Sequence, residues 1–420
     1  MQPPGDRLAL LYRVSQAFNS SLELDQVLNS VMDEVIAATR AERGFIVLRD
    51  GQDGLAFRAA RGIDQQTLDA PEFQVSRGVV ERVISEGRPL LASNAQTDDW
   101  LAKRATIITL GLRSILCVPL QLKTAILGVI YVDNRLQAGV FSQGDLDLLA
   151  AIASSAAIDI ENARLYAVAV EKGRMERELQ VAHDLQASLL PRSMPVISGW
   201  DIAAMWLPAR EVAGDFYDFV TAGRRLGIVI GDVCDKGMPA ALFMALSRTI
   251  LRASLGHGAA AQGMEKANRL ICADATNGMF VTVCYGQIDT AGGDLLCVNA
   301  GHNRPLVYQS ASDNMHALER RGMALGIEPS LRFAPMQAQE HAQLEAGDFV
   351  LFYTDGVTDA VSGQGEQFGA GRLREALFAN RHASAASIMN ALQQALRNFI
   401  GPAPQFDDIT AVLVKRTMDA

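Results

Sequence analysis

Hydrophobic positions in the first 140 residues switch between helical and extended spacing. Within residues 6–40 they recur three or four apart, which predicts a helix whose apolar stripe comprises Val27, Leu28, Val31, Val35 and Ile36. Short apolar runs separated by glycines predict strands at 45–48, 55–59, 114–120 and 125–132. A helical stretch at 79–86, closed by Gly87 and Pro89, lies between them. This mixture predicts an α+β unit.

Residues 145–190 carry a narrow apolar stripe, with no proline in the range. One set of apolar residues runs from Leu149 to Val170 and a second from Met175 to Leu189, out of step by five residues around Gly173. A narrow stripe buries little surface unless it meets a similar partner, so it favours a coiled-coil seam between two chains. The alternative is an amphipathic helix that lies on each neighbouring domain.

Residues 191–420 form a third segment with its own elements. The predicted strands are 200–207, 226–233, 279–288, 294–299, 305–308, 349–354 and 409–414. The predicted helices are 239–254, 260–275, 371–379 and 384–400. Because strands and helices come in runs and do not alternate strictly, the pattern again favours an α+β fold over a parallel sheet.

Charge and composition narrow the location and the partners. The net charge is -9, from 38 basic and 47 acidic side chains, and no run of five like charges occurs. Electrostatic binding to nucleic acid or to anionic lipid is therefore not expected. The longest stretch without a charged residue, 275–288, is shorter than the roughly 20 residues that span a bilayer. Five cysteines without a C-x-x-C pair, and no signal peptide, predict a cytoplasmic protein.

Acidic residues stand at the ends of predicted strands in the third segment. They are Asp215, Asp232, Asp355 and the pair Asp407-Asp408. The first three adjoin a glycine, which lets the backbone approach an ion closely. Each aspartate alone is also typical of a turn or a helix cap. Together they predict a site for Mg²⁺ or Mn²⁺, since hard oxygen ligands without His or Cys suit these ions better than zinc.

Residues 191–420 resemble the metal-dependent PPM-type protein serine/threonine phosphatases, in their bacterial SpoIIE/RsbU-like branch. The segments that carry the resemblance are ELQVAHDLQASLLP (178–191), PAREVAGDFYDF (208–219), GDVCDKGMPAALFMA (231–245), FVTVCYGQID (280–289), NAGHNRPLV (299–307), GMALGI (322–327), LEAGDFVLFYTDGVTDA (344–360) and FDDITAVLVKR (406–416). They occur in the order of the family and cover nearly all of this segment.

The resemblance implies an αββα sandwich of two antiparallel sheets with a site for two Mn²⁺ or Mg²⁺ ions. Its metal ligands would be Asp215, Asp232, the Val233 carbonyl, Asp355 and Asp407. Asp232 and Asp215 are the implied catalytic residues, with Asp232 bridging the ions. Asp407 is preferred to Asp408 because the first residue of the family's D-[DN] pair is the ligand, so Asp408 and Asp218 are secondary candidates. In the family, water activated by two metal ions attacks the phosphoserine phosphorus, and no covalent phospho-enzyme forms.

Arg210 stands five residues before Asp215, where eukaryotic relatives hold a phosphate-binding arginine. A guanidinium suits bidentate contact with phosphate, although a surface ion pair is the alternative interpretation. The chain departs from the family pattern at two positions. Ala213 replaces the glycine of V-G-G-D, and Asp235 replaces the glycine of D-V-x-G-K-G. We expect the added charge of Asp235 to alter metal affinity without abolishing activity.

Residues 24–163 resemble a GAF sensor domain. The segments that carry this resemblance are LDQVLNSVMDEVI, GVVERVISEGRPLL, SILCVPLQLKTAILGVIYVDN and FSQGDLDLLAAIASSAAIDIENARL. No histidine precedes His183 and Cys117 is the one cysteine before it, so a His-ligated haem or a Cys/His metal cluster is not expected here. A dimerising GAF domain and one that binds an unidentified small molecule both remain open.

These observations predict four parts: an N-terminal helix (1–23), a GAF domain (24–163), a coiled-coil linker (164–190) and a phosphatase domain (191–420). The expected function is a metal-dependent protein serine/threonine phosphatase, a hydrolase of bacterial signalling controlled by the GAF domain. The resemblance implies a phosphorylated anti-sigma-factor antagonist, or another STAS-type protein, as substrate. We expect a homodimer through the GAF domain and linker. The alternative is a non-catalytic module with a phosphatase fold that docks a partner.

Overall fold

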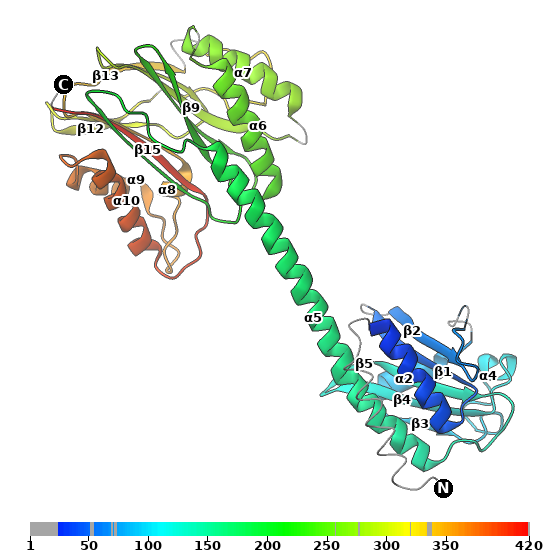
Figure 1. Cartoon of the computed structure of the whole chain (residues 1–420). Helices are drawn as coiled ribbons and strands as arrows, with labels where there is room; N and C mark the ends of the chain where they lie inside the picture. Colours follow the sequence, from blue (N-terminus) through cyan, green and yellow to red (C-terminus); the bar gives the residue numbers. More distant parts are fainter. Residues whose placement is uncertain are drawn as a thin grey trace. The chain divides into compact units, whose positions relative to one another are not determined.

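The structure is a computed structural model that describes residues 24–50, 54–68, 70, 74–256, 258–275, 278–319, 321–333 and 338–418 (Figure 1). The helix predicted at 1–23 lies outside the described residues. The chain divides into two compact units, Met1–Gly173 and Arg174–Ala420. Within the described ranges, no helix combines the length and the apolar character needed to cross a membrane.

The first unit is built on one antiparallel sheet with the strand order β2-β1-β5-β4-β3. Its strands are β1 (Arg43–Asp50), β2 (Gly54–Gly62), β3 (Leu90–Ala92), β4 (Ser114–Leu122) and β5 (Ala125–Asn134). Its helices are α2 (Leu24–Thr39), α3 (Arg77–Glu86), α4 (Ala105–Thr109) and the start of α5 (Gln143–Leu189). One hydrophobic core joins α2 and α5 to the sheet, and a second joins α3 and α4 to it. The α+β character predicted for this unit is confirmed.

Helix α5 confirms the long helix predicted over 145–190, but only part of its stripe is free. Leu149, Ile152, Ala156 and Ile160 are buried in the core with α2, so for this stretch the interpretation as a helix on the neighbouring domain holds. Further along, large apolar side chains are exposed: Leu165, Tyr166, Val168, Val170 and Met175. A seam between two chains is therefore restricted to the part of α5 after Ile160.

The second unit is a sandwich of two antiparallel sheets with the strand orders β13-β10-β9-β8-β7 and β12-β11-β14-β15-β6. The first sheet contains β7 (Phe216–Ala222), β8 (Arg225–Val233), β9 (Val281–Asp289), β10 (Asp294–Ala300) and β13 (Gln339–Gln343). The second contains β6 (Trp200–Leu207), β11 (Leu306–Gln309), β12 (Asn314–Ala317), β14 (Phe349–Tyr353) and β15 (Ile409–Arg416). Apolar residues of both sheets share one core, including Ile228, Val283, Phe352 and Val412.

Helices cover both outer faces of this sandwich. Helices α6 (Met238–Ser254) and α7 (Ala260–Asp274) pack on the first sheet, whereas α9 (Gly369–Ala379) and α10 (Ala385–Ile400) pack on the second (Figure 1). Helix α10 begins as predicted at Ser384, whose side chain accepts a hydrogen bond from the Ser387 amide. The αββα arrangement implied by the resemblance is confirmed.

Three strands and one short helix of this unit were not predicted. They are β7, β12, β13 and α8 (Asp355–Thr358). Strand β13 has the sequence QEHAQ and lies at a sheet edge, where backbone pairing with β10 sets its extended conformation without an apolar pattern. Strand β7 combines aromatic residues with the buried Asp218, which interrupts the alternation expected of a strand.

Pairing between strands brings the acidic positions to one end of the sandwich. Phe216, which follows Asp215, pairs with Gly231, which precedes Asp232. A Cβ atom at Gly231 would lie 2.5 Å from the Phe216 ring, so only glycine allows the two strands to approach this closely. At Gly356, directly after Asp355, a Cβ atom would lie 1.9 Å from the Asp408 carbonyl oxygen. These glycines let the strand ends that carry aspartates approach one another.

Candidate metal and substrate site

Asp215 is the most buried aspartate of the cluster, with a relative exposure of 2%. Its Oδ2 accepts a hydrogen bond from the Thr354 hydroxyl at 2.7 Å, and its carbonyl accepts one from Trp206 Nε1 at 3.0 Å. Burial, and next the charge of Asp232, raise the pKa of Asp215 well above its usual range. This carboxylate therefore stays ionised only if a cation lies beside it.

Asp232 lies at the end of β8 among the other carboxylates. Burial, followed by the charges of Asp355 and Asp407, raises its pKa to about 7. The pKa of Asp355 is raised by burial and by the charge of Asp407. Mutual repulsion of this kind is relieved either by protons or by cations. The structure thus brings together the aspartates predicted at the strand ends, and their shared electrostatics favour a bound cation.

Asp407 and Asp408 differ in what their carboxylates contact. Asp407 Oδ1 lies 2.9 Å from Lys236 Nζ, and the Asp407 side chain is 32% exposed. Asp408 instead accepts backbone hydrogen bonds from Ala209 at 2.7 Å and from Gly214 at 2.8 Å, one on each oxygen. Because its oxygens are already engaged by the backbone, Asp408 suits an ion less well than Asp407.

The donor set can be tested against a divalent metal. Within the residues that the structure describes, no three His, Cys, Asp or Glu side chains are already grouped as ligands of one ion. The chemistry of the donors nevertheless fits Mg²⁺ or Mn²⁺, because the site offers carboxylate oxygens whose charges repel one another. The position of a Cβ atom on Gly214 lies 3.1 Å from the Val233 carbonyl oxygen, so this glycine keeps the space beside that oxygen free.

Asp218 does not contact this cluster. Its buried carboxylate forms ion pairs with Arg248 Nη2 at 2.9 Å and with Arg252 Nη1 at 2.7 Å, both on α6. These pairs attach α6 to β7. In this structure Asp218 therefore contributes to the packing of a helix on a sheet, away from the other candidate residues.

Arg210 lies on the loop that leads to Asp215. Its side chain is exposed, and among the described residues it has no hydrogen bond or ion pair. The surface ion pair considered as the alternative is thus not formed here. An exposed guanidinium on a loop joined by hydrogen bonds to Asp408 is available to an anionic ligand.

Several residues beside the site were not singled out from the sequence for the roles they have here. They are Thr354, Lys236, Trp206, His183 and Gln186. Thr354 and Lys236 adjoin or lie near acidic motif residues, so their proximity could have been inferred from the motifs. Gln186 and His183 contact backbone atoms 27 and 28 residues later, which no spacing rule within a helix predicts.

Asp235 shows why the family pattern has a glycine at its position. Its backbone has φ of 74°, in the left-handed region that glycine adopts most readily. Its carboxylate accepts a hydrogen bond from the Lys236 amide at 2.8 Å, a local bond that helps aspartate adopt this conformation. The departure from the family pattern is therefore accommodated locally.

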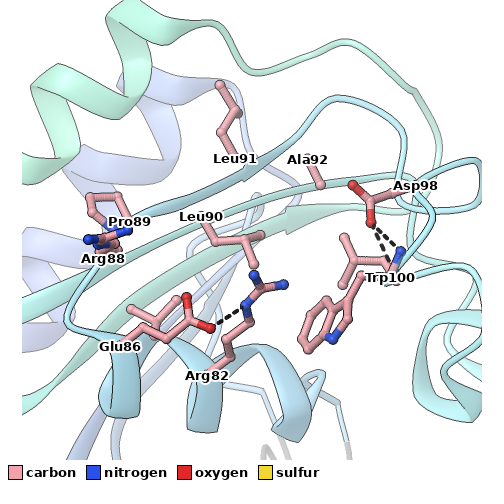
Figure 2. Close-up of a pocket in the computed structure, with 11 residues that line it drawn as sticks. Arg82, Glu86, Arg88, Pro89, Leu90, Leu91, Ala92, Asp98 and Trp100 are labelled. Atoms are coloured by element: carbon pink, nitrogen blue, oxygen red, sulfur yellow. Dashed lines mark hydrogen bonds and ion pairs between the residues drawn. The ribbon is translucent and has the colours of Figure 1, made fainter.

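The GAF unit has a pocket of about 220 Å³ between α3 and β3 (Figure 2). Arg82 forms an ion pair with Glu86 at 2.9 Å, and its guanidinium lies 4.3 Å from the centroid of the Trp100 ring. Asp98 accepts hydrogen bonds from the Trp100 and Leu101 amides. Both charge signs line this pocket, and Arg82 and Asp98 already have partners within the unit. The lining therefore does not indicate one ligand class.

Comparisons with known proteins assign both units. Residues 222–417 match the family "Stage II sporulation protein E (SpoIIE)", and residues 21–161 match the GAF domain. Protein IcfG of Synechocystis sp. is 36% identical over 281 residues, which are 60% of this chain and 43% of IcfG. Phosphoserine phosphatase RsbU of Bacillus subtilis is 30% identical over 186 residues, which are 44% of this chain and 54% of RsbU. The chain thus spans about half the length of these curated relatives.

A solved structure supports the fold of the second unit. The SiaA-PP2C domain of Pseudomonas aeruginosa superposes with a TM-score of 0.53 at 21% identity, covering 59% of this chain and 99% of that domain. At this identity the likeness concerns the fold, which agrees with the αββα sandwich described above. The chain therefore consists of an N-terminal GAF domain followed by a PP2C-type phosphatase domain of the SpoIIE family, similar to RsbU.

Proposed function

We propose that the second unit hydrolyses phosphoserine or phosphothreonine in a protein substrate, with Mn²⁺ or Mg²⁺ as cofactor. The observation that carries this proposal is the set of buried, mutually repelling carboxylates around Asp215 and Asp232. Such a cluster is costly to keep unless it holds cations. The match to the SpoIIE family and the similarity to a phosphoserine phosphatase support the same chemistry.

Each residue then has a distinct task. Asp215, Asp232, Asp355, Asp407 and the Val233 carbonyl would hold two divalent ions, with Asp232 placed to contact both. The ions, when bound, would supply an activated water and offset charge on the phosphoryl oxygens. Thr354 keeps the Asp215 carboxylate oriented through the hydrogen bond to Oδ2. Arg210, exposed and without a partner among the described residues, would bind the phosphoryl group of the substrate.

The substrate that we propose is a phosphorylated anti-sigma-factor antagonist or a similar STAS-type protein. The support is the similarity to RsbU, whose name describes a phosphoserine phosphatase, together with the family resemblance of the motifs. We further propose that the GAF unit controls this activity in a homodimer. The exposed apolar residues of α5 after Ile160 support pairing of two chains, since they otherwise remain in water.

The experiment that tests this function is phosphate release from a phosphoserine peptide by the full chain in the presence of Mn²⁺. We expect turnover by the wild type and a loss of at least a hundredfold in Asp232→Asn. Equal release by both proteins would place the activity outside this site. Absence of release with every phosphopeptide and with p-nitrophenyl phosphate would favour the alternative, a module that docks a partner without catalysis.

A further inference from the structure

The loop of residues 209–214 carries Arg210 and leads directly into Asp215. One side of this loop is held by Asp408, whose two carboxylate oxygens accept hydrogen bonds from the amides of Ala209 and Gly214. These two bonds fix the beginning and the end of the loop. They leave its middle, between Arg210 and Ala213, to be held by something else.

Gln186 of α5 holds this middle part. Its Nε2 donates to the Ala213 carbonyl at 2.7 Å, and its Oε1 accepts from the Ala213 amide at 2.9 Å. Gln186 is 5% exposed and Ala213 is fully buried, so water cannot replace these bonds if they break. A buried amide that uses both its donor and its acceptor on one residue determines the position of that residue closely.

His183 makes a second connection, one helical turn before Gln186. Its Nδ1 lies 2.7 Å from the Glu211 carbonyl oxygen. The His183 ring also stacks on Trp206, with 5.7 Å between ring centroids and 25° between ring planes. Trp206 in turn donates its Nε1 hydrogen to the Asp215 carbonyl at 3.0 Å. Contacts thus run from α5 both to the loop and to the backbone of Asp215.

We propose that His183 and Gln186 are positioning residues through which the last turns of α5 set the place of Arg210 and Asp215. The two side chains are three residues apart on a helix and contact carbonyl and amide groups two residues apart in the loop. A shift of α5 of about 1 Å would break these hydrogen bonds or carry the loop with it. This inference rests on the proposed function for its catalytic consequence, but its structural part can be tested without turnover.

The structural part is tested by hydrogen exchange of the peptide that covers 208–215, in the full chain. Gln186→Leu keeps much of the side-chain volume but removes both hydrogen bonds to Ala213. We expect exchange in this peptide to become at least tenfold faster. Gln180→Leu is the matched control, because Gln180 is exposed on the same helix and its Nε2 bonds Asp184 of that helix. It should leave exchange in 208–215 unchanged.

The catalytic part is tested by steady-state turnover of p-nitrophenyl phosphate in Mn²⁺. Gln186→Leu should lower kcat/KM about tenfold, mainly through KM, since a displaced Arg210 binds the phosphoryl group less well. If the effect passes through Arg210, Gln186→Leu should change KM little in an Arg210→Ala background. His183→Leu should resemble Gln186→Leu, whereas His183→Asn should retain more activity because it keeps a nitrogen near the position of Nδ1.

The outcomes separate this inference from the proposed function. Unchanged exchange in 208–215 for both Gln186→Leu and His183→Leu would overturn the inference, as would faster exchange with unchanged kcat/KM. If Gln186→Leu destabilises the whole unit, the comparison of His183→Leu with His183→Asn decides instead, and equal values for those two variants would also overturn it. If the wild type shows no turnover, the proposed function fails and exchange alone decides whether α5 holds the loop.

Discussion

At the scale of single residues, the account depends on carboxylates that repel one another. Asp232 and Asp355 both have pKa values raised by burial and by neighbouring aspartates. We expect Asp232→Asn and Asp355→Asn each to reduce turnover at least a hundredfold, which corresponds to roughly 3 kcal/mol of activation free energy. The free energy of unfolding without metal should stay level or rise, because each change removes one of the repelling charges.

Two measurements check this prediction: turnover in Mn²⁺ and denaturant unfolding in excess chelator. Near-normal turnover in both variants would favour the docking module without catalysis. A marked loss of stability in chelator would mean that these carboxylates stabilise the metal-free fold, contrary to the electrostatics described here.

His302 supplies a prediction about acid. It is buried, its Nδ1 lies 2.8 Å from the Thr282 hydroxyl oxygen, and burial lowers its pKa from 6.5 to about 3. Between these values the unfolded chain binds a proton that the folded chain does not, so stability falls as the pH falls below about 6.5. This group should cost about 2 kcal/mol between pH 6.5 and pH 5. In His302→Asn that part of the acid sensitivity should disappear.

Unfolding free energies of wild type and His302→Asn at both pH values give the measurement. The difference between the two proteins is the relevant quantity, because the other titrating groups are common to both. An identical pH dependence would show that His302 is protonated in the folded chain.

At the scale of elements, helix α5 is the part whose behaviour is most open to test. Gly173 lies within this helix, and a Cβ atom there would have nothing within 4 Å. Gly173→Ala should therefore stabilise the helix locally by about 1 kcal/mol without a steric cost. If α5 has two states, as a pairing seam would allow, the stiffer helix should change basal turnover of the full chain.

Turnover and light scattering on wild type and Gly173→Ala check this hypothesis together. A monomer at micromolar concentration, combined with equal turnover of the two proteins, would exclude α5 as a regulatory element. A dimer whose turnover changes in Gly173→Ala would support it.

The elements also show how far sequence reasoning reaches. The strands that end in Asp232 and Asp355 were predicted, because an apolar run followed by aspartate and glycine is a local signal. Strand β13 was missed, since an edge strand is extended by pairing and not by its own pattern. The coiled-coil interpretation extended too far towards Leu149, because helical spacing alone does not reveal whether a stripe meets its own domain or a second chain.

The residues around the site were predictable to the same degree. The glycine beside each predicted aspartate identified Asp215, Asp232 and Asp355. The roles of Gln186 and Asp408 were not predictable, because both bind backbone atoms that only the folded chain brings near them. Side chains that bond to the backbone of a distant loop leave no periodicity in the sequence.

At the scale of the whole molecule, two compact units with separate hydrophobic cores share one helix. The first part of α5 is buried in the GAF core, and its last turns contact the loop that precedes Asp215. This continuity in the chain is the physical basis for proposing that the GAF unit controls the phosphatase unit. It holds whatever the GAF unit binds.

The most direct test of the central claim is the turnover of p-nitrophenyl phosphate by the full chain, measured as Mn²⁺ is titrated from excess chelator to millimolar concentration. An all-carboxylate site without His or Cys holds its ions weakly, so removal by a chelator should be complete. The account predicts no turnover in chelator, a saturable rise with Mn²⁺ and full recovery after the chelator is exceeded. Full turnover in excess chelator would contradict it.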